Sequence, residues 1–129
     1  MEYELKHGKA LVITGPQGCG KTTLARKIAG QHGPFVEADA RQLGTRRGLN
    51  GLMAGEPSTV ICKGFPESGD TQARVKALIT GKTVKVERKR GGPKMVKAPN
   101  LIFCTSDADP LPLVDADRRF FVIDLGTPA

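Results

Sequence analysis

A glycine-rich segment, GPQGCGKTT, follows directly on a short apolar run near the start of the chain. It fits the pattern G-x-x-x-x-G-K-[ST] from Gly15 to Thr22, and the preceding run, Lys9–Thr14, has the composition of a buried parallel strand. From Lys21 the apolar spacing becomes helical and continues to Gly30. The order strand, turn, helix is the context in which this motif cradles phosphate groups. This feature therefore predicts an α/β core with a nucleotide site.

The residue types in this loop each suit phosphate binding. Glycines let the backbone turn and aim its N–H groups inward, and the helix start adds the positive end of a dipole. Lys21 is expected to reach the β- and γ-phosphates, and the Thr22 hydroxyl is expected to ligate Mg²⁺. The predicted cofactors are ATP and Mg²⁺. The predicted nucleotide-binding residues are Gly15, Pro16, Gln17, Gly18, Cys19, Gly20, Lys21, Thr22 and Thr23.

The rest of the chain alternates apolar runs with helical patterns. The further strands are expected at Phe35–Ala38, Thr59–Cys62, Leu101–Cys104 and Phe120–Ile123, and the further helices from the cap Asp39 to about Met53 and over Gln72–Thr80. Strands that alternate with helices predict a mostly parallel five-stranded sheet flanked by helices. At 129 residues, the chain has room for one such domain, spanning residues 1–129.

Positive charge is concentrated in one segment. Residues 82–97, KTVKVERKRGGPKMVK, hold seven Lys or Arg and one Glu, a local charge of +6 out of the net +7. Two alternating arms, Thr83–Glu87 and Lys94–Lys97, flank the turn-forming sequence RGGP. This pattern predicts a basic β-hairpin at about residues 83–98. So concentrated a basic block favours a polyanionic partner, and the alternative is a solvated basic loop.

Composition excludes several other classes of protein. No apolar run approaches the ~20 residues that a membrane-spanning helix needs, and the start, MEYELKHGK, is too polar for a secretory signal. The cysteines Cys19, Cys62 and Cys104 are odd in number, widely spaced and without CxxC spacing. They are typical of reduced thiols in a cytoplasmic protein rather than of a disulfide frame or a zinc site.

Two further segments carry a resemblance to a known family. They read VKALITGKTVKVERKRGGPKMVKAPNLIFCTSD and DADRRFFVIDL. From Ala10 to about Leu125 the chain resembles the superfamily 3 helicases of small DNA viruses and the related phage and plasmid primase-helicases. Those proteins are AAA+-type ATPases that form rings around single-stranded DNA. The resemblance implies an AAA+-like core, a homo-oligomeric ring, and single-stranded DNA and a primase or replication-initiator chain as partners.

The resemblance also implies roles for particular residues. Arg88, Lys89, Arg90 and Lys94 correspond to the hairpin that faces DNA in the central channel. Arg118 and Arg119 correspond to the finger arginine that reaches a neighbouring subunit's γ-phosphate. The alternative for one of these two arginines is a structural ion pair with Asp115 or Asp117.

The chain departs from the family at two strand ends. Where the family has paired carboxylates after the third strand, the Walker B position, this chain has Lys63-Gly64, and where the family has a sensor asparagine it has Asp107. These strands are neighbours in the AAA+ sheet, so Lys63 and Asp107 are expected to face each other. An ammonium there would repel Mg²⁺ and supply no base. Asp107, Glu67 or Asp39 is the candidate replacement acid; otherwise Lys63 points to solvent and the site is inactive.

Three functions remain open from the sequence. The first is an ATPase that acts on DNA as a ring, with Lys21, Asp107, Glu67, Arg118 and Arg119 as its candidate catalytic residues. The second is a non-hydrolysing nucleotide- and DNA-binding oligomeric module. The third is a small-molecule kinase, because KGFPES is similar to the D-G-F-P segment of adenylate-kinase-like enzymes, with Lys63 in place of the aspartate. The basic hairpin and the strand ending in TSD have no place in that kinase fold.

Overall fold

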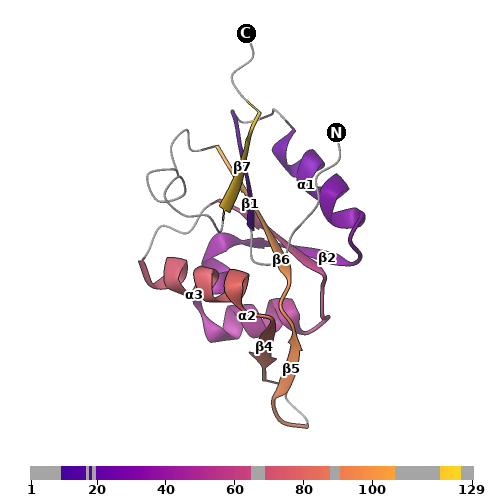
Figure 1. Cartoon of the computed structure of the whole chain (residues 1–129), viewed down its shortest axis with the longest axis vertical. Coiled ribbons are helices and arrows are strands. Elements are labelled where there is room, and N and C mark those ends of the chain that lie inside the picture. Colours follow the sequence, from indigo (N-terminus) through magenta and orange to yellow (C-terminus); the bar gives the residue numbers. More distant parts are fainter. Residues whose placement is uncertain are drawn as a thin grey trace.

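The computed structural model describes residues 10–16, 18, 20–64, 69–87, 91–106 and 120–125. Figure 1 shows the arrangement of the elements. The strands are β1 (Ala10–Thr14), β2 (Phe35–Asp39), β3 (Thr59–Lys63), β4 (Thr83–Val86), β5 (Lys94–Lys97), β6 (Asn100–Thr105) and β7 (Phe120–Asp124). The helices are α1 (Lys21–Gly30), the 3₁₀ helix η1 (Ala40–Gly44), α2 (Arg46–Met53) and α3 (Gly69–Thr80).

Five strands form one parallel sheet in the order β2-β3-β6-β1-β7. The apolar runs predicted as strands are therefore confirmed, as is the mostly parallel five-stranded sheet. β6 lies between β1 and β3, so the strand that enters the glycine-rich loop is separated from β3 by one strand. The resemblance to AAA+ ATPases implied that β3 and β6 are neighbours, and the register Lys63 to Cys104 confirms it.

The two faces of the sheet carry separate hydrophobic clusters. On one face, Ile13, Ile61 and Ile102 pack with Ala25 and Ile28 of α1. On the other face, the buried cluster joins strand residues to η1, α2, α3 and the β4–β5 hairpin. In Figure 1, α1 accordingly lies apart from α2, α3 and the hairpin, which gather at the other end of the view. Because side chains alternate along a strand, each strand supplies both clusters.

The predicted hairpin is present as an antiparallel pair. β4 and β5 pair in the register Val84 to Val96, and Val84, Val86 and Val96 are buried against the core. The alternate positions of both arms, including Lys85, are exposed. One face of the hairpin is therefore anchored to the domain, and the other carries charge into solvent. The tip residues Arg88, Lys89 and Arg90 lie outside the described residues.

The stretch predicted as one helix from the cap Asp39 to Met53 is two helices. Asp39 caps η1, since its Oδ1 accepts a hydrogen bond from Arg41 N at 2.9 Å and its own N–H donates to Gln42 Oε1 at 2.9 Å. Thr45 then caps α2, with its hydroxyl accepting from Gly48 N at 3.0 Å. A second N-cap at Thr45 ends the first helix and starts another.

Helix α3 begins at Gly69, three residues before the predicted start. With 12 residues it is the longest of the described helices, and none of these helices has the length and apolar character of a membrane span.

Candidate functional site

The glycine-rich loop connects β1 to α1, as its sequence predicts. Gly18 and Gly20 have φ values of +84° and +92°, which side-chain-bearing residues rarely adopt. Gly20 is also the N-cap of α1, and its carbonyl accepts the N–H of Leu24 at 3.0 Å. The loop thus delivers Lys21 as the first residue of the helix. The predicted residues Gln17 and Cys19 lie outside the described residues.

Lys21 points back over this loop. Its Nζ donates hydrogen bonds to the carbonyl oxygens of Gly15 at 2.7 Å and Pro16 at 3.0 Å. Thr22 follows in the first turn of α1 and is partly buried, whereas Thr23 is exposed. A lysine, a hydroxyl and the N–H groups at the start of a helix therefore lie together at the carboxyl end of β1. This is the chemistry that a phosphate group requires.

Cys104 forms the floor beneath the start of α1. Its Sγ lies 3.8 Å from the carbonyl oxygen of Lys21. Burial raises the pKa of the Cys104 thiol to about 11, although the nearby Lys21 ammonium lowers that pKa. Burial also raises the pKa of Cys62. Both thiols are free and buried, so they serve as packing groups and not as nucleophiles at neutral pH.

The end of β3 carries the departure from the family pattern. Lys63 pairs in register with Cys104 of β6 on one side and with Asp39 of β2 on the other. Gly64 follows with φ +84°, and its N–H donates to the Cys104 carbonyl oxygen at 2.7 Å. Lys63 itself is exposed. The other predicted catalytic residues, Glu67, Asp107, Arg118 and Arg119, lie outside the described residues.

The described acids nearest Lys63 are engaged with arginines. Glu37 of β2 binds Arg26 of α1 through two hydrogen bonds of 2.9 and 3.0 Å, which lower the pKa of the Glu37 carboxyl. Hydrogen bonds from the Arg41 side chain and backbone lower the pKa of Asp39. Both carboxylates are therefore ionised at neutral pH and already partnered. Asp39, a candidate replacement acid, lies beside Lys63, but its carboxylate caps η1.

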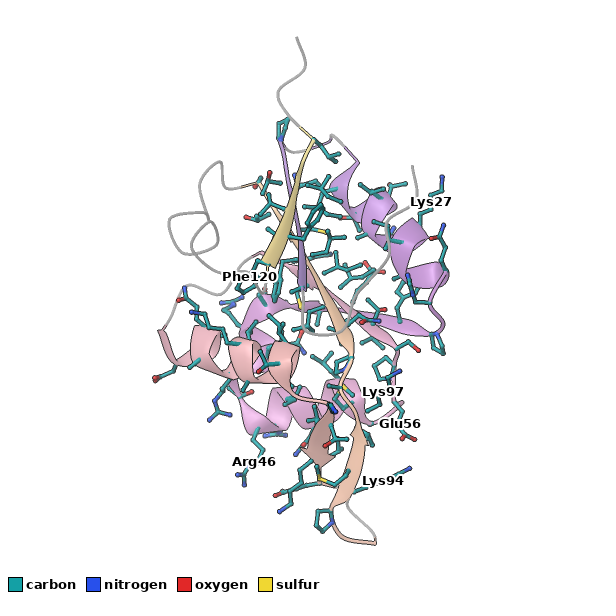
Figure 2. The ribbon with its side chains drawn as sticks, in the orientation of Figure 1. Lys27, Arg46, Glu56, Lys94, Lys97 and Phe120 are labelled. Atoms are coloured by element: carbon teal, nitrogen blue, oxygen red, sulfur yellow. The ribbon has the colours of Figure 1, made fainter. Side chains whose placement is uncertain are left out.

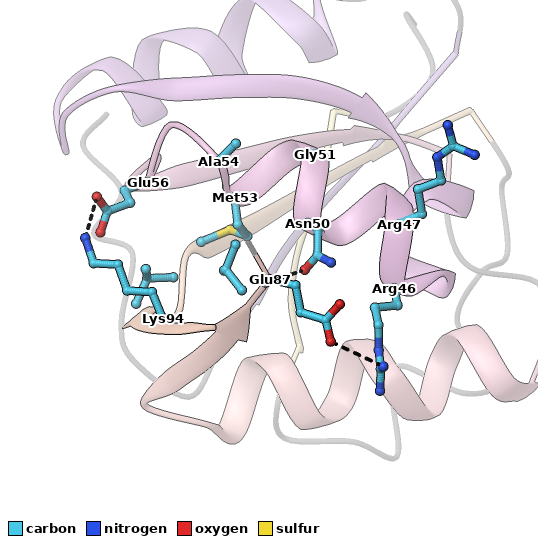
Figure 3. Close-up of a pocket in the computed structure, with 11 residues that line it drawn as sticks. Arg46, Arg47, Asn50, Gly51, Met53, Ala54, Glu56, Glu87 and Lys94 are labelled. Atoms are coloured by element: carbon cyan, nitrogen blue, oxygen red, sulfur yellow. Dashed lines mark hydrogen bonds and ion pairs between the residues drawn. The ribbon is translucent and has the colours of Figure 1, made fainter. Parts of the chain in front are cut away.

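A second polar region lies between α2 and the hairpin. A pocket of about 990 Å³ opens there, lined by residues of both elements. As Figure 3 shows, an ion pair stands on either side, Arg46 with Glu87 at 3.5 Å and Lys94 with Glu56 at 3.3 Å. Between them, Asn50 Oδ1 accepts the Glu87 N–H at 3.4 Å. The predicted DNA-binding residue Lys94 therefore lies on the hairpin beside cationic α2.

Sequence reasoning missed the α2 side of this region. Arg46, Arg47 and Asn50 line the pocket, and Arg46 meets a residue 41 positions later in the chain. The one local signal was a pair of arginines after the cap Thr45. Figure 2 shows Arg46 and Glu56 in the same part of the molecule as Lys94 and Lys97. None of the described residues that line the pocket comes from β1, α1 or the glycine-rich loop.

The sheet order and the loop together define a P-loop NTPase-like core. A model of the family of unknown function DUF5906 matches residues 13–119, and the chain belongs to that family. Among solved structures, the fold is similar to the A-form apo structure of the NrS-1 C-terminal region, with a TM-score of 0.67 and 27% identity over 97% of this chain. A second structure of that region, residues 305–718, gives a TM-score of 0.62 at 27% identity over 92% of this chain. This chain spans 31% and 28% of those chains.

Curated proteins match over shorter stretches. The spermidine/putrescine import ATP-binding protein PotA of Aliivibrio fischeri is 51% identical over 39 residues, which are 30% of this chain and 9% of PotA. PotA of Bacillus thuringiensis is 53% identical over 34 residues, which are 26% of this chain and 10% of that protein. A match of this length is long enough to hold a phosphate-binding loop with its flanking strand and helix, and too short to cover the sheet. Together with the fold, it supports nucleotide binding.

Proposed function

We propose that this chain is the nucleotide-binding core of an ATPase that resembles superfamily 3 helicases and binds single-stranded DNA through its basic hairpin. The observation that carries the proposal is the placement of the Gly15–Thr22 loop. The loop joins the inner strand β1 to α1 in a parallel sheet, and Lys21 lies at the helix start. The short similarity to PotA, an import ATP-binding protein, supports ATP as the nucleotide.

Nucleotide binding would replace contacts that Lys21 makes within the loop. Its ammonium exchanges the carbonyl oxygens of Gly15 and Pro16 for the charged β- and γ-phosphate oxygens, which are stronger acceptors. The N–H groups of the loop and of the first turn of α1 bind the remaining phosphate oxygens. The residues proposed to hold the nucleotide are those predicted from the sequence, residues 15–23.

Thr22 is the proposed Mg²⁺ ligand, and the described residues provide few further ligands for the ion. In the part of the chain that the structure describes, no group of three His, Cys, Asp or Glu side chains is arranged for a metal ion. The Thr22 hydroxyl would hold Mg²⁺ together with the phosphates and water, and the ion would help neutralise the phosphate charge. The described residues fit such a weakly held ion, and they do not provide a carboxylate at the end of β3.

Hydrolysis is proposed to be slow unless another acid substitutes. Lys63 supplies no general base, and Asp39 is tied to Arg41. Asp107 and Glu67 are the proposed replacements, and Arg118 or Arg119 is the proposed finger arginine of a neighbouring subunit. A finger arginine and a channel hairpin act between subunits, so the proposal includes a homo-oligomeric ring.

The hairpin suits a nucleic-acid backbone. Its buried valines fix it to the core, while Lys85, Lys94 and Lys97 are exposed on its arms. Lys94 pairs with Glu56 at 3.3 Å and Arg46 pairs with Glu87 at 3.5 Å, and all four side chains are exposed. Exposed ion pairs of this kind are weak, so phosphates can replace the two glutamates as partners. With Arg88, Lys89 and Arg90 at its tip, the hairpin tracks phosphates without reading sequence.

A second candidate function is a module that binds nucleotide and DNA without hydrolysis. Lys63-Gly64 at the end of β3 is the observation that favours it. The third function that the sequence left open, a small-molecule kinase, has less support, because both arms of the basic hairpin are present and that fold has no place for them.

Steady-state release of phosphate from ATP, with and without single-stranded DNA, separates these candidates. The ATPase predicts turnover that rises with DNA at low salt and disappears in Lys21→Ala. ATP binding without turnover would favour the non-hydrolysing module. Absence of ATP binding in the folded wild-type chain would overturn both.

A further inference from the structure

Lys63 lies at the carboxyl ends of the strands, on the face of the sheet that α1 covers, as the nucleotide loop does. It is the register partner of Cys104, and partners in register on parallel strands project from the same face. Cys104 faces α1, because its Sγ lies 3.8 Å from the Lys21 carbonyl oxygen and it packs with Ala25. Lys21 lies above Cys104 of β6, and Lys63 lies at the same level on the neighbouring strand β3. Neighbouring strands are about 4.8 Å apart, so the two lysines project from adjacent positions on this face.

The charge on Lys63 acts on this face of the sheet, and no described carboxylate forms an ion pair with it. Its ammonium contributes to the lowered pKa of Glu37, which also faces α1. Glu37 nevertheless pairs with Arg26, and Asp39 pairs with Arg41. Among the described residues, no ion pair involves Lys63, whose side chain is exposed. An ammonium with no carboxylate partner among the described residues therefore lies where the phosphates of a nucleotide are proposed to bind.

The described residues at these strand ends offer few ligands for the metal ion that usually accompanies such a nucleotide. In P-loop NTPases Mg²⁺ is held by the loop hydroxyl together with a strand-end aspartate. Here Thr22 is present, but the described residues offer no cluster of metal-binding side chains, and β3 ends in a lysine. The Lys63 ammonium repels a divalent cation and attracts the same phosphate oxygens.

From these observations we infer that Lys63 binds the triphosphate of ATP in the place that a strand-end carboxylate has elsewhere, so ATP binding by this chain does not require a divalent cation. The inference rests on the proposed nucleotide site and deepens it. Lys63 supplies one positive charge and three N–H donors on a flexible stem, so it neutralises phosphate oxygens without demanding metal geometry. Lys21 and Lys63 then bind the phosphates from two sides.

The test is a calorimetric titration of the folded chain with ATP at low salt, once in EDTA and once in excess MgCl₂. For the wild type we expect the two dissociation constants to differ by less than about tenfold. For Lys63→Gln we expect metal-free affinity to fall about tenfold, the size of one charged hydrogen bond, while Lys63→Arg retains most of it. Lys63→Asp should bind ATP only when Mg²⁺ is present.

Lys27→Gln is the matched control. It removes the same charge from the last turn of α1, at the far end of the helix from the loop (Figure 2), and should leave both titrations unchanged. Unfolding curves of every variant establish that the fold is retained.

The outcomes separate this inference from the proposed function. If the wild type binds ATP only with Mg²⁺, or if Lys63→Gln binds metal-free ATP as the wild type does, the inference is wrong. In that case loss of binding in Lys21→Ala still supports the nucleotide site. If the wild type binds ATP in neither buffer, the proposed function itself fails.

Discussion

The two ends of β6 lead to two regions that are built by different means. At its carboxyl end lies the nucleotide-loop region, which rests on buried strands in fixed register and on two glycines with positive φ. At its amino end, the chain enters from the hairpin, which carries many charges and forms exposed ion pairs with Arg46 of α2 and with Glu56, which follows α2. One region is preorganised by packing, whereas the other is adjustable by charge.

This difference indicates how each region would meet its ligand. A compact triphosphate needs N–H groups and lysines that are already in place, and the buried sheet supplies that rigidity. A polyanion of variable shape needs cations that can change partners, and exposed ion pairs cost little to exchange. Both regions share β6, so a destabilising substitution in that strand should affect both regions. A substitution of a surface residue should affect only the region in which it lies.

The largest expected effect follows from the shared strand. Phe103 of β6 is fully buried, and Phe103→Ala should lower the free energy of unfolding by about 3–5 kcal/mol, from lost burial and the cavity left behind. Phe121→Ala, on β7 with 53% of the residue exposed, should cost about 0.5 kcal/mol. Urea unfolding measures both, and equal losses would contradict the placement of the core.

A backbone effect comes next, at the end of β3. Gly64 has φ +84°, so Gly64→Glu should cost about 1–2 kcal/mol of stability, although no neighbour blocks a Cβ there. Gly55, which is equally open and has no positive φ, provides the control Gly55→Glu, which should cost less. Thermal unfolding compares the two variants.

The same position bears on hydrolysis. Lys63→Asp combined with Gly64→Glu restores two carboxylates at the strand end and should raise ATP turnover at least about tenfold with Mg²⁺. Unchanged turnover in a folded double variant that still binds ATP would show that these positions do not limit hydrolysis.

A smaller effect is expected at Thr59, the first residue of β3. The Thr59 hydroxyl is fully buried and has no hydrogen-bond partner among the residues that the structure describes. Thr59→Val keeps the shape and removes that polar group, so it should stabilise the chain by about 1 kcal/mol. The reverse change at the next buried position, Val60→Thr, should destabilise it. Stabilisation by both changes, measured by urea unfolding, would contradict this reading.

The smallest effect is a pH dependence at the nucleotide-loop edge. The bond with Arg26 places the pKa of Glu37 below its ordinary value of 4.5 in the folded chain. The contribution of Glu37 to stability is therefore fully present above about pH 4.5 and is lost as the pH falls through the lowered pKa. The difference in melting temperature between wild type and Glu37→Gln should be constant above that pH and shrink below it. A difference that grows on acidification would contradict the assignment.

Local patterns carried most of what the sequence could predict. The loop from Gly15 to Thr22, the apolar runs of the strands and the alternation around Val84 and Val96 each specify an element through near neighbours in the chain. Contacts across long separations were not accessible in this way. The pairs Arg26 with Glu37 and Arg46 with Glu87 depend on which faces the fold brings together, 11 and 41 residues apart.

The division at Thr45 was missed for a different reason. Apolar spacing continues through residues 40–53, and only the capping hydroxyl of Thr45 breaks the run. The resemblance predicted that β3 and β6 are neighbours in the sheet. That arrangement places Lys63 beside Cys104. The predicted roles of Glu67, Asp107, Arg88 and the paired arginines Arg118 and Arg119 stay predictions.

The measurement that tests the separation of the two regions most directly is a paired titration of two variants. Lys21→Ala and the triple variant Arg88→Gln, Lys89→Gln, Arg90→Gln are each titrated with ATP and with fluorescent single-stranded DNA at several salt concentrations. We expect Lys21→Ala to lose ATP and keep DNA. The triple variant should keep ATP, bind DNA more weakly and show a salt dependence shallower by about 2 in log–log slope. Loss of both ligands in either folded variant would contradict the account.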